Sequence, residues 1–257
     1  MEFVLIILVA LAGAFLSFFS GFGLGTLLLP AFLVVFPPPV AIAATAVVHM
    51  LNNLFKLFLV GRYAQRQVLA AFGITSVMGA WLGAQGMETL AASDTRYAWS
   101  LGALHGTVAP VNLVVGLLII LFALLESWKR FEQLVVPRKW FPVGGFVSGF
   151  FGGLSGHQGA LRSAFLMKSG MNKEAFMGNR VVLACMVDLT RIAVYAGMIR
   201  TGWKDMNPAM VLLATLAAFT GAWFGNTYMK KVELGFINRI VIISLLLFGA
   251  AMSLGLV

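Results

Sequence analysis

Long apolar runs recur along the whole chain and are separated by short polar stretches. A membrane-spanning helix needs about 20 consecutive apolar residues, and several runs approach or exceed that length, namely 1–35, 41–60, 68–87, 108–125 and 241–257. Hydrophobic residues make up 60% of the chain and charged residues 11%, which is too little charge for the surface of a soluble domain of this size. The pattern therefore predicts an all-α polytopic membrane protein.

Two apolar segments are interrupted by glycine and are too long for a single span. The first is 3–36, with glycines at 21–25, and the second is 141–168, with glycines at 152–159. Glycine weakens a helix and permits a turn. A straight helix over the first segment would be about 50 Å long, well beyond the ~30 Å hydrocarbon core. We expect each segment to be a re-entrant hairpin of two half-helices, with a kinked full span as the alternative.

Three ordinary spans are expected after each broken segment. In the first half they are predicted at about 40–60, 68–88 and 98–125, and in the second half at 176–199, 208–229 and 237–256. The hairpin form leaves three crossings in each half. Because three is an odd number, the two halves would then lie inverted in the membrane, a plan that recurs among transporters.

The two halves also share short motifs in the same order. The pentapeptide GAWLG at 79–83 matches GAWFG at 221–225. Further matches join Ser17, Phe19, Gly21 and Gly25 to Ser148, Phe150, Gly152 and Gly156. An ordered series of matches indicates a duplication. We predict a first membrane repeat over 1–125, a charged cytoplasmic linker over 126–140 and a second membrane repeat over 141–257.

Loop cations divide unevenly between the two sides if both broken segments are hairpins. One side then carries most of them: Arg62, Arg66, Lys129, Arg130, Arg138, Lys139, Lys168, Lys173, Lys230, Lys231 and Arg239. The other side keeps Arg96, Arg200 and Lys204. Because Lys and Arg collect in cytoplasmic loops, both termini are expected on the periplasmic side of a bacterial inner (plasma) membrane. The same bias explains the formal net charge of +9 without a nucleic-acid partner.

Four cations fall inside the apolar spans. They are Lys56, Arg162, Arg180 and Arg191, and each costs about 2.5–3.5 kcal/mol near the centre of a membrane helix. Arg180 and Arg191 share one helical face with Asp188 by their spacing. Asp188 has two readings: it carries a coupling proton, or it forms an ion pair with Arg191 that holds helices together. Lys56 and Arg180 also lie close enough to span ends to snorkel.

The matching span of the first half carries a similar polar face. Thr45, His49, Asn52 or Asn53, and Lys56 recur at helical spacing. Two such faces turned toward each other would form a basic cleft rich in hydrogen-bond donors, which suits an anion. Arg191 is the deepest cation and the leading candidate to bind it.

The glycine breaks supply the second half of the predicted anion site. A half-helix that begins after each break would point the partial positive charge of its N-terminus at the midplane. His157, Gln158 and Arg162 follow the second break, whereas the first break is followed by apolar residues. The second hairpin is therefore expected to contribute more to selectivity. Close helix packing is the alternative role for these glycines.

Catalytic and metal sites are not expected. Ser155 lies in a G-x-S-G run, but no histidine follows His157, and His157 itself is expected to be poorly placed as a base. Cys185 is alone, and the sequence has no metal-ligand cluster, no nucleotide-binding loop and no sign of a cofactor. His105 is expected to be a buried core histidine.

The duplicated broken segment, polar span and glycine motif resemble the TauE/SafE family, also called the toluene sulfonate uptake permease family. The resemblance covers nearly the whole chain and is carried by 20–25, 79–83 and 221–225. It implies a secondary carrier for a small sulfur-containing anion, sulfite or a sulfonate such as sulfoacetate, which we expect to be exported by alternating access. An anion channel and a carrier of a non-sulfur carboxylate are the alternatives, and an intramembrane enzyme is a remote one.

The expected binding residues combine the polar faces with the second break. Partners other than the anion are membrane lipid and a second copy of the chain in a homodimer. The residues expected to bind the anion are Arg191, Arg162, His157, Gln158, Asn179, Arg180, Thr45, His49, Asn52, Lys56 and Ser155.

Overall fold

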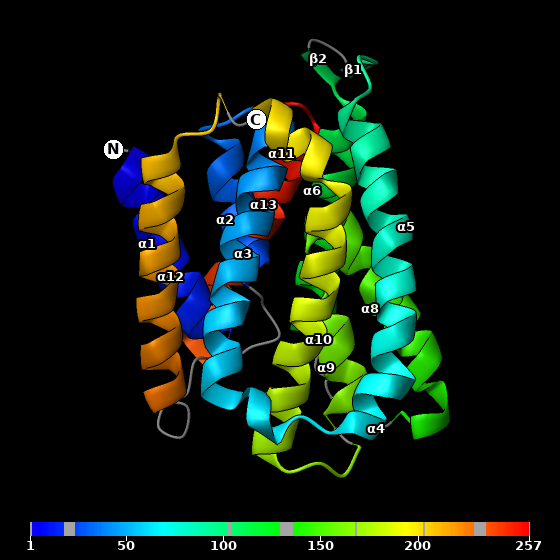
Figure 1. The fold of residues 1–257 in the computed structure, drawn as a ribbon. Helices are drawn as coiled ribbons and strands as arrows, with labels where there is room; N and C mark the ends of the chain where they lie inside the picture. The colour runs from blue at the N-terminus through cyan, green and yellow to red at the C-terminus, as the bar shows by residue number, and fades with distance from the viewer. Residues whose placement is uncertain are drawn as a thin grey trace.

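The computed structural model describes residues 2–17, 24–101, 104–128, 136–167, 169–202, 204–228 and 235–256. Within these ranges the protein is a bundle of helices with one small hairpin of strands (Figure 1). Four helical segments are long and apolar enough to cross a membrane, namely 38–63, 66–91, 110–127 and 208–228, and a bent pair of helices forms a fifth. The protein is therefore a multi-pass, almost entirely α-helical membrane protein.

The elements of the first half follow the predicted order. They are α1 (Glu2–Leu16), α2 (Leu24–Leu33), α3 (Pro38–Val60), the 3-10 turn η1 (Gly61–Tyr63), α4 (Arg66–Val68), the π-helical turn η2 (Leu69–Gly73), α5 (Ile74–Ala91), β1 (Tyr97–Leu101), β2 (Leu104–Val108) and α6 (Pro110–Ser127). Proline occupies the first turn of α3 and of α6, where its missing N–H leaves no helical hydrogen bond unmade.

The second half begins after residues that lie outside the description. Its elements are the 3-10 turn η3 (Arg138–Trp140), α8 (Phe141–Ser155), α9 (Gly159–Leu166), α10 (Lys173–Val194), α11 (Ala196–Gly202), α12 (Pro208–Tyr228) and α13 (Gly235–Ser253). The cap of α10 is Asn172, whose side chain accepts a hydrogen bond from the amide of Ala175 at 2.8 Å. The division into repeats at 126–140 stays a prediction.

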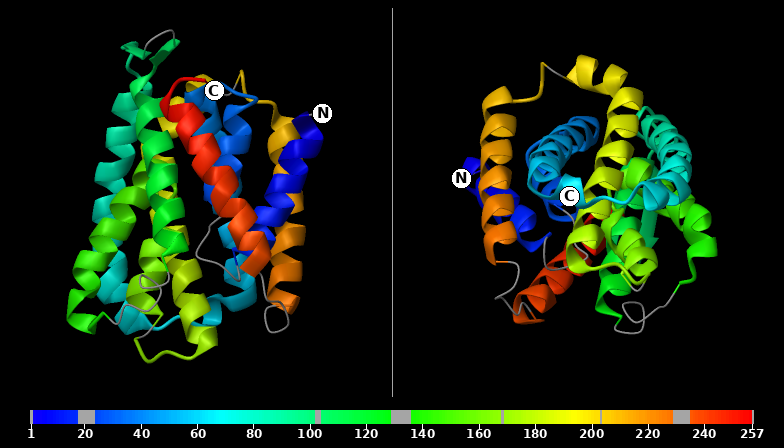
Figure 2. Two further views of the ribbon diagram at one scale, coloured as in Figure 1. Left: turned by 180° about the vertical axis from the view of Figure 1, so that it is seen from behind. Right: turned by 60° about the horizontal axis from the view of Figure 1, so that its bottom comes forward.

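Both broken segments have the hairpin form. α1 runs inward from the end of the molecule where the N-terminus lies, and α2 leads back to that end, where α3 begins (Figures 1 and 2). α8 enters from the opposite end, and α9 leads back to it, where α10 begins. Gly25 at the start of α2 lies beside the turn between α8 and α9, since a Cβ on it would be 3.6 Å from the carbonyl oxygen of Gly156. Of the opening motif 20–25, residues 20–23 lie outside the described residues.

The main helix contacts join the first half to the second. α1 packs along α12, α5 along α8, α3 along α10 and α6 along α13. α1 and α8 each open a half, and α12 and α5 are the second of the three spans that follow, so each opening helix packs on the corresponding span of the other half. Each hairpin is therefore held by a helix from the opposite half of the chain.

The repeated glycine motif lies where these helices touch. A Cβ on Gly83 of α5 would overlap the backbone carbonyl oxygen of Phe150 on α8, and a Cβ on Gly221 of α12 would overlap that of Leu11 on α1. Small residues allow such close approach of helices in membranes. Gly83 and Gly221 therefore allow these helix pairs to pack closely.

The predicted span over 98–125 is too long at its start. Residues 97–101 and 104–108 pair as antiparallel strands, with Tyr97 opposite Val108, and the helix begins only at Pro110. Aromatic and β-branched residues such as Tyr97, Trp99 and Val108 favour strands, a preference that the apolar character of the later residues 110–125 conceals. His105 is exposed in β2, so its predicted place in the core is wrong. The indole nitrogen of Trp99 donates to the carbonyl oxygen of Leu254 at 3.0 Å and ties the hairpin to the C-terminal helix.

The predicted span over 176–199 ends earlier than expected. α10 stops at Val194 and α11 continues at an angle of 62°. The bend follows Tyr195, which is fully buried and donates its hydroxyl to the carbonyl oxygen of Gly153 on α8 at 2.7 Å. This bond fixes the end of α10 against the second hairpin.

Two glycines of α5 offer a matched test of the close packing between α5 and α8. We expect Gly83→Ala to lower the free energy of unfolding by about 1–3 kcal/mol, the usual cost of overpacking, because the new methyl group meets backbone. Gly86→Ala places its methyl group 3.6 Å from a Leu154 side-chain carbon, which is ordinary contact, and should be neutral. The midpoint of thermal unfolding in detergent measures both; equal midpoints for the two variants would contradict this packing.

Candidate functional site

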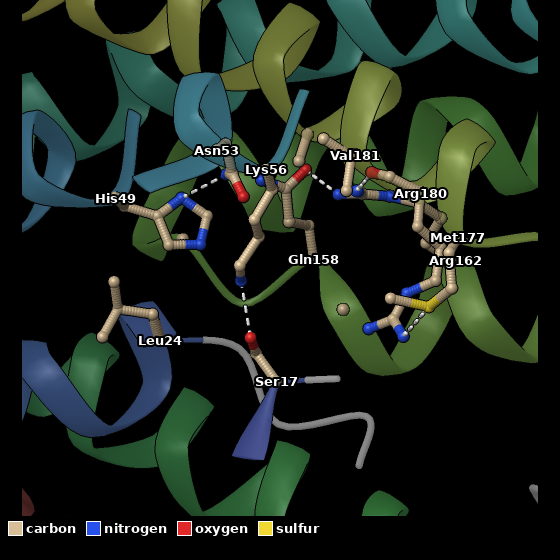
Figure 3. A pocket seen from close by; sticks show the side chains of 13 residues that line it. Ser17, Leu24, His49, Asn53, Lys56, Gln158, Arg162, Met177, Arg180 and Val181 are labelled. Carbon is tan, nitrogen blue, oxygen red and sulfur yellow. Dashed lines mark hydrogen bonds between the residues drawn. The ribbon is translucent and has the colours of Figure 1, made fainter. Parts of the chain in front are cut away.

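A small cavity of about 50 Å³ lies where α3, α10 and the second hairpin meet (Figure 3). It reaches Leu24 at the start of α2 and Gly156 at the turn of the second hairpin, so both hairpins border it. One water needs about 10–15 Å³, so the cavity has room for a few water-sized groups. Its polar lining consists of Ser17, His49, Asn53, Lys56, Gln158, Arg162 and Arg180.

The three cations of this lining are held by contacts with the protein. Lys56 is buried and donates to the hydroxyl oxygen of Ser17, just after α1, at 2.6 Å, so it does not snorkel to the surface. The guanidinium of Arg162 donates to the side-chain oxygen of Gln158 and to the backbone carbonyl oxygen of Arg180. Arg180 is half-buried, and its guanidinium carbon lies 5.4 Å from the ring centre of Phe176. The three cations therefore reach the cavity from α3, α9 and α10.

Asp188 connects the polar faces of α3 and α10. Its carboxylate accepts a hydrogen bond from Asn53 at 2.7 Å and lies 2.7 Å from the Nδ1 atom of His49. The side-chain nitrogen of Gln158 lies 3.4 Å from the same carboxylate, and that of Arg191 lies 3.9 Å away. The ion pair that was predicted between Asp188 and Arg191 is therefore present but long, and the short bonds of Asp188 run to α3.

Arg191 lies directly behind the turn of the second hairpin. It is fully buried, and its Nε and Nη1 atoms have no hydrogen-bond partner among the described residues. Gly156 at the turn has a φ of 83°, and a Cβ there would be 2.8 Å from Nη1 of Arg191. Only glycine adopts this conformation without strain and leaves room for the guanidinium. Gly156 lines the cavity and Arg191 does not, so Arg191 lies behind the turn and outside the cavity lining.

The backbone of α9 adds to the positive potential at the cavity. α9 begins at Gly159, which lines the cavity, and Gln158 precedes it. The N-terminus of a helix carries partial positive charge and free amide donors. The predicted half-helix tip is thus present in the second hairpin, while Thr26 in the first is buried in α2 and does not line the cavity.

Several residues expected to bind the anion have structural contacts away from the cavity. The hydroxyl of Thr45 donates to the carbonyl oxygen of Ala41, one turn back in α3, at 2.7 Å. The side-chain oxygen of Asn179 accepts from the backbone amide of Gln65 at 2.9 Å and so holds the start of α4 on α10. With its amide turned to satisfy both atoms, Asn52 accepts from Lys56 at 3.1 Å and donates to α12. Asn52 therefore lies outside the cavity lining and connects Lys56 to α12.

Ser155 and His157 lie together outside the cavity lining. The hydroxyl of Ser155 is 2.9 Å from the Nδ1 atom of His157, so the expectation that His157 is poorly placed is wrong in its geometry. The ring of His157 stacks on that of Phe122 at 5.4 Å, and its Nε2 atom has no partner within the described chain. A serine nucleophile needs a base that a third group orients, and the structure gives His157 no such group.

Two polar residues of the cavity were missed or left open by sequence reasoning. The sequence did not decide between Asn52 and Asn53, because adjacent residues on a helix differ by only 100° and both lie near the polar face. Ser17 was noted only as a match to Ser148. The structure gives both serines a place at the hairpins, since Ser148 donates to the carbonyl oxygen of Gln158 at 3.2 Å. The internal repeat could have identified Ser17 as a candidate, because Ser17 matches Ser148.

These features define a multi-pass membrane protein with a basic cavity bordered by two pairs of short helices, α1 with α2 and α8 with α9. Over the part of the chain that is described, no group of three or more His, Cys, Asp or Glu side chains could hold a metal ion. Residues 5–252 match the family model of the sulfite exporter TauE/SafE. The match spans nearly the whole chain, and the protein belongs to this family of membrane transporters. No curated protein and no solved structure matches the chain.

The contact between Gly156 and Arg191 can be tested against a second glycine with the same backbone conformation. Gly170 has a φ of 82° and nothing near its Cβ position within 4 Å, whereas Gly156 faces Arg191. Alanine at either position carries the left-handed strain of roughly 1–2 kcal/mol. We expect Gly156→Ala to lower the unfolding midpoint further than Gly170→Ala, and to weaken anion binding as well. Equal effects of the two variants on both measurements would show that the approach of Arg191 is unimportant.

Proposed function

We propose that this protein is a secondary carrier that exports a small sulfur oxyanion, sulfite or a sulfonate such as sulfoacetate, across a bacterial inner membrane. The observation that carries the proposal is Arg191, a fully buried cation with two unsatisfied donor atoms beside a polar cavity. A buried donor without a partner costs about 1–3 kcal/mol, and more when it is charged. An anion that moves from the cavity to the turn at Gly156 would supply the missing acceptors.

The charge around the cavity favours an anion over a neutral or cationic substrate. Lys56, Arg162 and Arg180 line it, and Arg191 lies behind it, while Asp188 is the acid among these residues. Charges interact strongly in a medium of low dielectric constant. An incoming anion therefore offsets excess positive charge that the bilayer interior disfavours.

The size of the cavity favours a small headgroup. A sulfite ion or a sulfonate headgroup consists of one sulfur and three oxygen atoms, and about 50 Å³ accommodates a group of that size. The oxygens can accept hydrogen bonds from several directions at once, and the donors come from α3, α9 and α10. A carboxylate offers two oxygens in a plane and would leave more of these donors unused.

The arrangement of the hairpins supports alternating access through inverted repeats. α1 with α2 enters from one end and α8 with α9 from the other, and the cavity lies between them (Figure 2). Carriers built from inverted repeats bind substrate near the midplane, beside broken helices, and expose it to each side in turn. Each hairpin packs on a helix of the other half, so a movement of one hairpin against its neighbours could open one side while the other stays closed.

The orientation in the membrane follows from the loop charges. α4, η3 and the start of α10 lie at the end of the molecule opposite to both termini (Figure 1), and these segments carry Arg66, Arg138 and Lys173. The positive-inside rule assigns this end to the cytoplasm. In this proposal both termini are periplasmic, and the substrate is loaded from the end that carries the cations.

Counterflow in liposomes tests the proposed function. Purified protein is reconstituted with sulfite, sulfoacetate, taurine, sulfate or a simple carboxylate inside, and uptake of labelled anion is measured. We expect saturable exchange with sulfite or a sulfonate and weak exchange with carboxylates. Flux that does not saturate, without counterflow, would instead indicate an anion channel. Absence of all flux with folded protein would overturn the proposal.

Arg191 is the residue whose loss should be most damaging to transport. We expect Arg191→Gln to lower the affinity for the anion at least about 100-fold, because a charged hydrogen bond in a desolvated site contributes about 3 kcal/mol or more. The control is Arg200→Gln in α11, an exposed cation. Both variants should migrate as monodisperse protein in detergent; unchanged affinity in folded Arg191→Gln would remove Arg191 from the site.

A further inference from the structure

The imidazole of His49 has a fixed orientation. Its Nδ1 atom lies 2.7 Å from a carboxylate oxygen of Asp188, and a carboxylate accepts hydrogen bonds but donates none. The proton of neutral His49 is therefore on Nδ1. Asp188 in turn is held by Asn53, which donates to the same oxygen at 2.7 Å. The pair is buried, with one partner on α3 and the other on α10.

The opposite nitrogen of this ring faces the region where the anion is proposed to bind. Nε2 is 3.8 Å from the Cβ position of Gly25, at the point where the two hairpins meet. Figure 3 shows this nitrogen on the side of the ring turned toward the middle of the cavity lining. Neutral His49 presents a lone pair there, which repels an anion. Protonated His49 presents an N–H donor, which binds one.

We propose that the His49–Asp188 pair takes up one proton when the anion binds, and that the carrier therefore moves the anion and a proton together. The proton goes to Nε2 of His49, which becomes a donor to the anion, while Nδ1 keeps its bond to Asp188. This inference rests on the proposed function and deepens it, because it names the coupling ion of the same site.

Other charged and titratable groups surround the pair. Those that interact with it are Lys56 on α3, Arg162 on α9, His157 before α9, and Cys185 and Arg191 on α10. Glu88 of α5 lies beyond the end of α10, 3.8 Å from the Cβ position of Gly197, and the charged group of η1, Arg62, is exposed. A bound anion adds negative charge beside this pair, which links proton uptake to anion binding.

The groups around Asp188 argue against a sodium ion as the coupling ion. A bound Na⁺ needs several oxygen ligands, as other hard cations do. The atoms around the carboxylate are nitrogens of His49, Asn53, Gln158 and Arg191. All are donors or cations that would repel a metal ion. The site accordingly takes its positive charge as a proton on an existing side chain.

Charge balance gives the proposal a distinctive consequence. A monovalent anion that crosses with one proton transfers no net charge, so its flux should not respond to membrane potential. Binding and proton uptake are reciprocal, so affinity should rise by up to about tenfold for each unit that the pH falls, as long as binding takes up one proton. Methanesulfonate is a suitable probe because its own charge is constant near neutral pH.

The decisive experiment measures proton uptake when methanesulfonate binds to the detergent-solubilised full chain. Calorimetry in two buffers with different ionisation enthalpies gives the number of protons taken up. We expect close to one at neutral pH for the wild-type protein and for His105→Gln, whose histidine is exposed in β2. His49→Gln keeps a side chain that can donate a hydrogen bond but cannot titrate, so whatever methanesulfonate it binds should be bound with no proton uptake and no pH dependence. In liposomes the number of protons moved per anion should fall to about zero, whatever rate of exchange remains.

The outcomes separate this proposal from the one on which it rests. Wild-type protein that binds methanesulfonate without proton uptake, or with uptake unchanged in His49→Gln, overturns the coupling site and leaves the carrier intact. Failure of the wild-type protein to bind methanesulfonate or any anion of the counterflow panel overturns the proposed function, and the coupling site with it. Asp188→Asn provides a second variant, since it should also lose proton uptake; normal uptake in it would contradict the role of the pair.

Discussion

Uncompensated positive charge in a medium of low dielectric constant is the constraint on which the rest of this structure depends. Lys56, Arg162 and Arg191 lie buried inside a membrane protein, with Asp188 as the acid in their midst. Charged groups in such surroundings must be paired or hydrogen-bonded. Lys56 and Arg162 meet this requirement with protein oxygens. Arg191 pairs with Asp188 at 3.9 Å, and its Nε and Nη1 atoms have no hydrogen-bond acceptor among the described residues. In the proposed function a bound oxyanion supplies the missing acceptors.

The hairpins explain how polar side chains and backbone groups come to lie inside a bundle of apolar helices. A continuous helix uses all its backbone groups internally and would hide them from a substrate. The interruption of the helix at Gly156 exposes the start of α9 and lets Arg191 approach the turn closely. Irregular backbone is tolerated at this depth only when protein surrounds it. Tyr195 contributes to that enclosure by bonding to Gly153.

Close helix packing and the polar contacts of the site both join the two halves of the chain. Gly83 and Gly221 bring α5 against α8 and α12 against α1, so that each hairpin is supported by the opposite half of the chain. The short bonds of Asp188 to His49 and Asn53 then join α3 to α10 across the middle. In the proposed mechanism, the side chains that bind the anion are neighbours of the side chains that connect the two halves. Anion binding therefore alters the contacts between the halves.

The sequence by itself determined the membrane class, the family, the two broken segments and the set of buried cations, because hydropathy, glycine position and helical spacing are local properties of a chain. It misjudged the start of the span predicted at 98–125, where paired strands form instead of helix, and it did not choose between Asn52 and Asn53. Only the tertiary structure decided that the broken segments are hairpins, that Asn179 and Thr45 serve the fold, and that His49 meets Asp188. Those outcomes depend on which residues from distant segments become neighbours, and 139 positions separate His49 from its partner.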